Sequence, residues 1–472
     1  MHGLPAVRQI MQGSTGQERK QSMREELVRL FENARVPRYT SYPTAPHFSG
    51  DVGAEDYGQW LEELDARHRV SLYFHVPFCH QLCWYCGCNT TVTHNRERII
   101  DYTDRMAREL DLLEARLHSR LKLTHLHWGG GTPTTAGAEG ILSLMTRARE
   151  IFDFDNDAEI AIEIDPRSFS ADDIGMLAQS GFNRVSIGVQ TFDSTVQQAI
   201  NRMQDFACVK TAVDGLRSAG IGRISMDLLY GLPHQTVDTL ERTVSRVLEF
   251  RPDRIALFGY AHLPARIRHQ RMIDESALAD PTGRAAQYEA VGDMLSRAGY
   301  VAIGLDHFAL PGDSMAIAAR NGTLHRNFQG YTTDAADALI GVGASSIGSL
   351  PQGYVQNHVR TDDYRQSIEA GRLPVARGLR LDAQMRLDRA IIERIMCDGA
   401  VDLRQLAEGS GLPDHAAEPN AAVMGRLHEL GIVRREGTRL EVTRECRPLL
   451  RLVAASFDRF LDPSGDRHAA AI

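Results

Sequence analysis

The stretch SLYFHVPFCHQLCWYCGC, residues 71–88, joins an apolar, β-rich run to a loop that holds four of the chain's seven cysteines. The run SLYFHV predicts a buried strand. Cys79, Cys83, Cys86 and Cys88 follow it, and cysteines so closely spaced indicate a bound metal or cluster. Four thiolates around one ion would form a closed structural site, whereas three around a 4Fe-4S cluster would leave one iron open to chemistry.

The cysteine spacing favours an iron–sulfur cluster over zinc. Cys79-x3-Cys83-x2-Cys86 gathers three soft thiolates in a loop too short for regular structure, which suits one face of a cuboidal cluster. Zinc ligands usually come as two pairs many residues apart, and the sequence has no second Cys or Cys/His pair at that spacing. These residues leave open whether Cys88 is a fourth ligand.

Short β-rich runs continue along the chain and alternate with amphipathic helical segments, such as those after residues 95 and 234. This alternation is typical of βα units with a parallel sheet. The fold class is therefore α/β, and six units favour a partial (β/α)6 TIM-like barrel. After the run at residue 71, the expected strands are 124–128, 159–164, 184–189, 223–228, 254–260 and 301–308.

Polar or glycine-rich groups follow strand after strand. Cys79 follows the first strand, Gly130-Gly131-Thr132 the second, and Glu163, Gln190 and Asp227 lie at the ends of the next three. Because the C-terminal ends of barrel strands carry the active site, we expect these groups to meet at one mouth. The glycines would let backbone groups approach a ligand, and the carboxylates would suit an ammonium or ribose hydroxyls, although each could equally be a cap or an ion-pair partner.

Composition and patterning suggest four regions. Residues 1–34 form a variable tail, 35–70 a lead-in that packs on the barrel, 71–370 the barrel with a substrate-binding extension, and 371–472 a C-terminal part. That last part reads as three helices and a hairpin around Glu436-Gly437, and so resembles a winged helix. Such a module can bind DNA or serve as a packing or lid domain.

The bulk properties are those of an ordinary globular protein, with 43% hydrophobic and 24% charged residues. A net charge of −8 argues against a dedicated nucleic-acid binder. The sequence contains no run of apolar residues long enough for a membrane span and no secretory signal at its start, so we expect no membrane span and a cytoplasmic location. Clustered free cysteines fit that reducing compartment.

The loop C-x3-C-x2-C after a first barrel strand, followed by GGGTPT, resembles the radical S-adenosylmethionine (SAM) superfamily. Within it, the chain resembles the oxygen-independent coproporphyrinogen III oxidases from about residue 30 to the C-terminus. The matching stretches are CHQLCWYCGCN at 79–89 with its extra Cys88, PRYTSYPTA at 37–45, HWGGGTPT at 127–134, DLLYGLP at 227–233, YAHLP at 260–264 and LHRNFQGYTT at 324–333.

This resemblance implies that Cys79, Cys83 and Cys86 ligate a 4Fe-4S cluster whose fourth iron binds SAM. It implies a second SAM beside the first, and a role for Cys88 that spacing does not supply. A 5′-deoxyadenosyl radical would then start the decarboxylation of two propionates of coproporphyrinogen III to vinyl groups, giving protoporphyrinogen IX. The implied cofactor-binding residues are Tyr73, Tyr85, Gly130, Gly131, Thr132, Glu163, Gln190, Arg202, Asp227, Ala261 and Ile347.

The substrate carries four carboxylates on a flat apolar macrocycle, so its pocket should combine apolar walls with basic side chains. Candidate contacts are Arg38, His307, Arg320, His325 and Arg326. We expect a monomer that receives electrons from a flavodoxin- or ferredoxin-like donor and passes one to an unidentified acceptor. The alternatives are a haem chaperone, whose relatives typically lack the extra cysteine and the lead-in motif, or a radical enzyme for another tetrapyrrole or a methyltransferase.

Overall fold

The computed structural model of the protein describes residues 36–461, with the backbone alone for residues 444 and 445. The tail expected at residues 1–34 and the first residue of the lead-in lie outside this range. No helix of the described chain is long and apolar enough to cross a bilayer.

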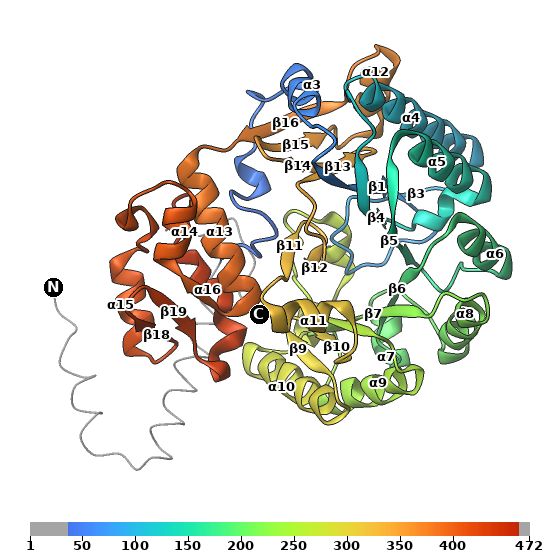
Figure 1. Ribbon diagram of the computed structural model, residues 1–472. Coiled ribbons are helices and arrows are strands. Elements are labelled where there is room, and N and C mark those ends of the chain that lie inside the picture. The colour runs from blue at the N-terminus through green and yellow to red at the C-terminus, as the bar shows by residue number, and fades with distance from the viewer. Residues whose placement is uncertain (1–35, 462–472) are drawn as a thin grey trace.

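Six parallel strands form the centre of a curved twelve-stranded sheet, ordered β16-β15-β14-β13-β1-β4-β5-β6-β7-β8-β10-β9 (Figure 1). Helices cover its outer face, and the two edge strands, β16 and β9, do not pair with each other, so the barrel is open. The six expected βα units and the partial barrel are confirmed. The central strands are β1 (Arg69–Val76), β4 (Lys122–Gly130), β5 (Asp153–Ile164), β6 (Arg184–Gln190), β7 (Arg223–Tyr230) and β8 (Arg254–Gly259). The outer helices are α4 (Arg96–Glu114), α5 (Gly137–Ile151), α6 (Ala171–Ser180), α8 (Phe206–Ser218), α9 (Val237–Phe250) and α10 (Pro281–Arg297).

Alternation along the strands separates the core from the site. In β1, Leu72 and Phe74 are fully buried beneath the helices, and Phe74 packs edge-to-face on Trp128 of β4 with ring centroids 4.6 Å apart. Successive side chains of a strand point to opposite faces, so the residues between them, such as Tyr73 and His127, face the barrel interior. The strands thus place polar groups inside without weakening the outer core.

Four strands beyond the predicted ones extend the sheet past β1. β13 (Ala338–Val342) pairs parallel with β1, from Val70↔Ala338 to Phe74↔Val342. β14 (Ile347–Leu350), β15 (Gly353–Asn357) and β16 (Val375–Arg380) continue as an antiparallel meander. β1 is consequently an interior strand, and the cysteine loop that follows it has a neighbour on each side.

The strand predicted at 301–308 is wrong as a single element. It is a hairpin of β9 (Val301–Ile303) and β10 (His307–Ala309), and β10 runs antiparallel to β8. Gly304 makes the reversal possible with φ +56°, and a Cβ there would lie 1.9 Å from Cζ of Tyr331. Only glycine allows both this backbone conformation and this close contact.

The lead-in contacts two parts of the protein. Phe48 stacks on Tyr354 of β15, with ring centroids 5.4 Å apart, and α3 (Ala54–Glu62) packs on the sheet. Tyr39 and Tyr42 instead join the hydrophobic cluster of the C-terminal helices. The expectation that this segment packs on the barrel is therefore incomplete, because its first residues bind the C-terminal part.

The C-terminal part lies beside the open side of the barrel (Figure 1). Its helices and hairpin occur in the predicted order, and a short strand, β17, joins the hairpin sheet. Its elements are α13 (Ala383–Asp398), β17 (Ala400–Asp402), α14 (Leu403–Gly409), α15 (Ala421–Glu429), β18 (Val433–Glu436), β19 (Arg439–Val442) and α16 (Leu450–Ala455).

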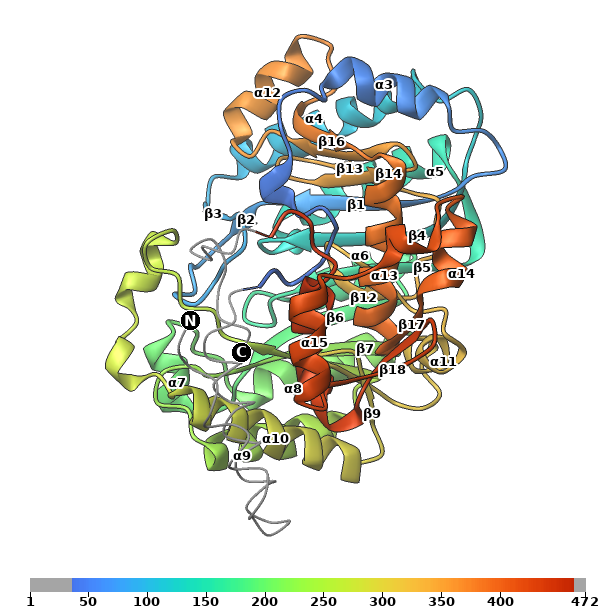
Figure 2. The same cartoon turned by 90° about the vertical axis from the view of Figure 1, so that its left-hand side faces the viewer.

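The remaining elements are short. Figure 2 shows β2 and β3 at one end of the barrel strands and α11 at the other. The remaining strands are β2 (Phe78–Cys79), β3 (Thr91–Val92), β11 (His325–Asn327) and β12 (Gly330–Thr332), and the remaining α-helices are α7 (Ser194–Ala199), α11 (Ser314–Asn321) and α12 (Thr361–Glu369). The 3₁₀ helices are η1 (Ala45–His47), η2 (Pro133–Ala136), η3 (Arg268–Met272), η4 (Glu275–Ala277), η5 (Asp414–Ala417) and η6 (Arg444–Leu449).

Candidate active site

The cysteine loop begins where β1 ends, and the parallel pairing of β2 with β3 holds its two ends together. Cys83 is buried, Cys79 and Cys86 are half-buried, and Cys88 is exposed. Thr132 donates to Cys79 Sγ at 3.6 Å. A hydrogen bond from the Cys88 thiol is the main cause that lowers the pKa of Cys86 to about 6, and the Cys88 backbone N–H lies 3.4 Å from the same sulfur. In this structure Cys88 therefore contacts the Cys86 sulfur through both its thiol and its backbone N–H.

Two guanidinium groups surround Cys83. Arg167 Nη2 lies 3.3 Å and Arg202 Nη1 3.5 Å from its Sγ, and both arginines also bind Asp165. Burial alone would raise the pKa of Asp165, but Arg167 and Arg202 hold it below its usual value. Both arginines therefore place hydrogen-bond donors beside the Cys83 sulfur, one of the three sulfurs in the C-x3-C-x2-C loop.

The glycine loop after β4 packs directly against the cysteine loop. The Gly131 N–H donates to the Val76 carbonyl at 2.9 Å, and the Thr132 N–H donates to the Phe78 carbonyl at 2.8 Å. A Cβ on Gly131 would lie 2.6 Å from the Phe78 carbonyl oxygen and 2.9 Å from Cys79 Sγ. Glycine is therefore required at this position so that the two loops can contact each other. From the sequence, glycine was expected here only because the backbone would approach a ligand.

Polar side chains from three strands meet inside the barrel next to these loops. His127 Nε2 lies 3.1 Å from Glu163 Oε1, and the Tyr73 ring stacks on His127 with centroids 6.0 Å apart. The Tyr73 hydroxyl lies 3.0 Å from His75 Nδ1. A Cβ on Gly129 would come within 2.9 Å of Glu163 Oε1 and 3.0 Å of the Tyr73 hydroxyl, so the backbone of Gly129 also packs against these polar side chains.

Asp227 completes the interior group. Its Oδ2 accepts a hydrogen bond from Ser186 at 3.3 Å. Burial first, and then the charge of Glu163, raise the pKa of Asp227 to about 6. A buried carboxyl group with a second carboxylate beside it is suited to a cationic group such as an ammonium.

Arg202 lies between the interior and the cysteine loop. Its Nη2 donates to the Gly188 carbonyl at 2.6 Å, and the Gln190 amide lies over the same glycine. Gln190 has φ +64° beside a bulge in β6, an uncommon conformation for a residue other than glycine. Within residues 36–461, the buried Arg202 Nε has no hydrogen-bond partner, so it can take an acceptor atom from a ligand.

The remaining predicted cofactor residues adjoin this group. Gln270 Nε2 donates to the carbonyls of Tyr85 and Ala261, each at 3.1 Å, and thereby ties the segment after β8 to the cysteine loop. Ile347 is the first residue of β14. A Cβ added to Gly341 would lie 3.0 Å from the Ile347 backbone, and Gly341 is the residue of β13 that pairs with Tyr73. The structure therefore brings the predicted cofactor residues to one end of the barrel.

The donor set fits a 4Fe-4S cluster with SAM. Three thiols lie in one loop, an arginine with an unused N–H borders it, and two carboxylates lie beyond. Within the described chain, no three His, Cys, Asp or Glu side chains lie close enough to share a single metal ion. A cluster does not require that convergence, since each thiolate binds a different iron.

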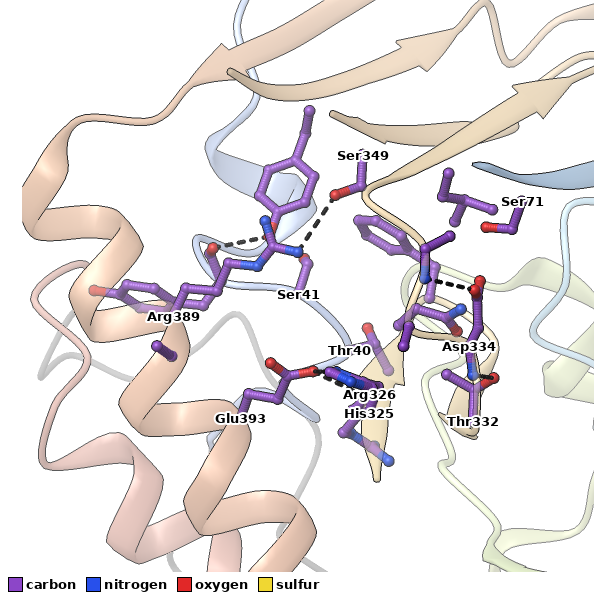
Figure 3. Close-up of a pocket in the computed structure, with 18 of the residues that line it drawn as sticks. Thr40, Ser41, Ser71, His325, Arg326, Thr332, Asp334, Ser349, Arg389 and Glu393 are labelled. Carbon is purple, nitrogen blue, oxygen red and sulfur yellow. Dashed lines mark hydrogen bonds and ion pairs between the residues drawn. The ribbon is translucent and has the colours of Figure 1, made fainter. Parts of the chain in front are cut away.

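A cavity of about 370 Å³ opens between the lead-in, the β11–β12 hairpin and α13 (Figure 3). Two of the predicted substrate residues line it. His325 Nδ1 lies 3.2 Å from Glu393, and Arg326 Nε donates to the Tyr39 carbonyl at 3.1 Å. Arg326 Nη1 is buried, and no residue of the described range accepts from it. Arg389 of α13 lies across the cavity, over the Tyr354 ring.

The other substrate candidates separate into two groups. Arg38 donates to the Gly259 carbonyl at the end of β8 at 3.2 Å, and His307 lies 2.7 Å from Asp306 on the inner side of β10. Arg320 is different, because it is exposed in the last turn of α11, at the end of the strands opposite the cysteine loop (Figure 2). The expectation that Arg320 contacts the substrate is therefore not supported by its position.

Several residues of the site were missed in the sequence. Asp165 and Arg167 follow Glu163 by two and four residues just after β5, and this position at a strand end was the available signal. His127 stands inside the quoted HWGGGTPT motif. His269, whose Nε2 lies 2.7 Å from the Cys86 carbonyl, and Gln270 reach the loop from a distant segment and had no local signal.

The sequence is similar to that of proteins of one known family. A family model described as the Radical SAM superfamily matches residues 73–247. The oxygen-independent coproporphyrinogen III oxidase of Bradyrhizobium diazoefficiens is 49% identical over 450 residues, which cover 95% of this chain and 100% of that protein. The Escherichia coli protein of the same name is 38% identical over 431 residues, covering 91% of this chain and 94% of that protein.

A solved structure of a protein from this family has the same fold. Coproporphyrinogen III oxidase (HemN) from Escherichia coli, described as a radical SAM enzyme, superposes with a TM-score of 0.86 at 36% sequence identity. The match covers 91% of this chain and 100% of that chain, so it extends well beyond the stretch that the family model matches.

Proposed function

The chain belongs to the oxygen-independent coproporphyrinogen III oxidases, within the radical SAM superfamily, and we propose that it decarboxylates two propionate side chains of coproporphyrinogen III to vinyl groups without oxygen. The product would be protoporphyrinogen IX, and the reaction a step of haem biosynthesis. The observation that carries the proposal is the contact between the cysteine loop and the glycine loop, with Arg202, Glu163 and Asp227 beside it.

Cys79, Cys83 and Cys86 would hold the 4Fe-4S cluster, with Cys88 as a neighbour that is not a ligand. When bound, the cluster and SAM supply a 5′-deoxyadenosyl radical, which removes a hydrogen from a propionate. Arg167 and Arg202 would donate hydrogen bonds to the Cys83 sulfur when it binds the cluster.

The interior residues would bind and orient SAM. Glu163 offers a carboxylate to an ammonium or to ribose hydroxyls of the SAM bound to the cluster. Asp227 and Arg202 Nε, which is available to a carboxylate, would serve a second SAM molecule. The stacked rings of Tyr73 and His127 form an aromatic wall beside these groups. We further propose a second SAM molecule. Its site would use Tyr85, Gly131, Thr132, Gln190, Arg202, Asp227 and Ala261.

The cavity at the open side of the barrel would take carboxylate arms of the substrate. At about 370 Å³ it suits side chains of a large macrocycle, and the unpartnered Arg326 Nη1 offers a charged hydrogen bond. His325 lines the same cavity, while Arg38 and His307 lie toward the mouth. Arg326 is the first of these to test, because its free N–H group has no other use in the described structure.

We propose that residues 35–70, 71–370 and 371–472 act as lead-in, barrel with substrate-binding extension, and C-terminal packing domain. Separate hydrophobic clusters in the barrel and the C-terminal helices support this division. The seven cysteines are free, which fits the cytoplasm. We expect a monomer that accepts electrons from a flavodoxin- or ferredoxin-like donor, and no binding to duplex DNA in an anisotropy titration.

The deciding experiment is anaerobic turnover of the iron-reconstituted protein with dithionite, SAM and coproporphyrinogen III. The expected result is 5′-deoxyadenosine and protoporphyrinogen IX formed together, identified by mass. Cleavage of SAM that is independent of the substrate would contradict the proposal. Tight haem binding without either product would instead favour the chaperone.

A further inference from the structure

A salt bridge just after β5 lies against the sulfur of Cys83. Arg167 Nε donates to Asp165 Oδ1 at 3.0 Å and Arg167 Nη2 donates to Asp165 Oδ2 at 2.6 Å. The Arg167 backbone N–H also donates to Oδ1, at 3.1 Å. The two side chains are only 13% and 15% exposed. A guanidinium held at two points by one carboxylate has a fixed orientation, so Asp165 sets the direction of the other N–H groups.

The outer edge of this guanidinium faces the cysteine loop. Arg167 Nη2 lies 3.3 Å from Cys83 Sγ, and Arg167 Nη1 donates to Gln81 Oε1 at 3.1 Å. Gln81 lies between Cys79 and Cys83 in the chain. Arg167 therefore reaches from the end of a barrel strand to the loop, where it contacts one sulfur and one neighbouring side chain.

The same pairing occurs a second time in the chain, without such contacts. Arg67 donates to Asp65 through Nε at 3.2 Å, through Nη2 at 2.6 Å and through its backbone N–H at 3.0 Å. This pair precedes β1, at the end of that strand opposite the cysteine loop, and the Arg67 side chain is 88% exposed. An Asp-x-Arg turn thus needs neither burial nor a third partner. The contacts of Arg167 with the loop therefore require another reason.

The three sulfurs of the motif receive different donors. Cys83 has two guanidinium groups beside it, Arg167 at 3.3 Å and Arg202 at 3.5 Å. In the part of the chain that the structure describes, the donors to Cys79 and Cys86 are neutral: a threonine hydroxyl for Cys79, and a thiol and its backbone N–H for Cys86. Hydrogen bonds from charged donors are the stronger ones. The strongest donors to these sulfurs are therefore concentrated on Cys83.

Hydrogen bonds to the sulfurs are one of the factors that set the reduction potential of an iron–sulfur cluster. Reduction adds negative charge to the cluster, so an N–H aimed at a ligand sulfur stabilises the reduced form more than the oxidised form. Asp165 also pairs with Arg202, and it offsets part of the positive charge of the two arginines. The expected effect is therefore that of oriented N–H groups rather than of a surplus of charge.

We propose that Arg167 raises the reduction potential of the 4Fe-4S cluster through its hydrogen bond to the Cys83 sulfur, and that Asp165 positions Arg167 for this bond. Reduction adds one electron to the oxidised cluster from a low-potential one-electron donor, and no bond to the protein forms or breaks. The inference rests on the proposed function, because that reaction requires a cluster that can be reduced before SAM is cleaved.

The test is a redox titration of the iron-reconstituted protein, with the reduced cluster followed by electron paramagnetic resonance. Dithionite is the reductant, and neither SAM nor substrate is present. Arg167→Gln should lower the ratio of reduced to oxidised cluster about tenfold at a given potential, which is a midpoint lower by about 59 mV for one electron. Its SAM Kd should stay within twofold of wild type, because Arg167 is not among the residues expected to bind SAM.

Two variants that preserve charge separate orientation from charge. Arg167→Lys cannot bind Asp165 at two points and still reach both Cys83 and Gln81, and Asp165→Glu moves the carboxylate that aims the guanidinium. Each should lower the midpoint by part of the Arg167→Gln shift. Wild-type midpoints in both variants would show that charge alone acts, and would overturn the proposed hydrogen bond.

Arg67→Gln is the matched control, because it breaks the same local pairing far from the cysteine loop. It should leave the midpoint unchanged. A midpoint of Arg167→Gln equal to that of Arg67→Gln would overturn the proposal. If Arg167→Gln loses its cluster, Arg167→Lys decides, and loss of the cluster there too would show that Arg167 holds the cluster instead of tuning it.

The titration also separates this inference from the proposed function. A wild-type cluster that is reduced normally but forms no protoporphyrinogen IX would refute the proposed function. The shift between wild type and Arg167→Gln would still be measured, since it needs no substrate.

Discussion

Replacing Gly131 by alanine should weaken cofactor binding far more than it weakens the fold. The added Cβ would lie 2.6 Å from the Phe78 carbonyl oxygen and 2.9 Å from Cys79 Sγ, against ordinary contacts of 3.4–4 Å. The Phe78 carbonyl cannot retreat freely, because it accepts the Thr132 N–H at 2.8 Å. Overpacking costs about 1–3 kcal/mol and a lost backbone hydrogen bond about 1 kcal/mol more.

This strain lies at the buried base of the cysteine loop, whose outer residues 87–89 are exposed, so the protein can relieve it by moving the cysteine loop rather than by unfolding. A loss of about 2–4 kcal/mol at the loop corresponds to roughly a 30- to 1000-fold weaker hold on the cluster and SAM. The assay is the iron content after reconstitution, together with the SAM Kd from equilibrium dialysis. The midpoint of thermal unfolding of the cofactor-free protein, measured in parallel, should fall by only a few degrees.

Gly175→Ala is the matched control. Gly175 lies inside α6, and a Cβ added to it would have no neighbouring atom within 4 Å. Alanine should therefore leave cofactor binding unchanged and stabilise the helix by about 0.5–1 kcal/mol. If Gly131→Ala keeps wild-type iron content and a SAM Kd within twofold, cofactor binding does not depend on close contact between the two loops.

Three further predictions concern the same site. Cys88→Ala should keep the wild-type iron content, whereas Cys86→Ala should lose it; loss in both would make Cys88 a ligand. Because burial raises the pKa of Asp227 to about 6 from 3.8, its ionisation opposes folding, so the stability of the cofactor-free protein should fall by up to about 3 kcal/mol as pH rises from about 4 to 6. Asp227→Asn should remove that slope in urea unfolding, and an identical slope in the variant would contradict it. Arg202→Lys keeps the charge but cannot replace both the 2.6 Å bond to Gly188 and the contact with Cys83, so the SAM Kd should rise about 10- to 100-fold at constant iron content; an unchanged Kd would remove Arg202 from the site.

The parts of the fold that were predictable are those with a strong local pattern. The six central strands are short β-rich runs that alternate with amphipathic helical segments, and the polar groups that end them lie together as expected. The single strand at 301–308 failed because the turn at Gly304 depends on Tyr331, which local sequence does not reveal. β13 was missed although its sequence, ALIGV, is apolar throughout; the run is short and contains a glycine, and its place in the sheet depends on pairing with β1, far away in the chain.

The candidate site shows the same division. Cys79 and Gly131 were identified from motif spacing, which is local. Gln270 and His269 were not, because their roles consist of hydrogen bonds to backbone carbonyls of the cysteine loop, and any polar side chain of suitable length could make them. Arg320 was expected near the substrate on residue type alone, and the topology places it at the other end of the strands.

The pairing of β1 with β13 has a consequence for biosynthesis of the protein. The Arg69 N–H donates to Asp337 across 268 residues, so β1 lacks one neighbour until most of the chain has left the ribosome. The Gly343 that ends this pairing would clash with the His75 carbonyl if it carried a side chain, so the far segment also fixes the base of the cysteine loop. Long-range strand pairs form late in folding. The nascent thiols should therefore stay accessible to oxidants through much of translation, and cluster insertion should follow chain release rather than accompany synthesis.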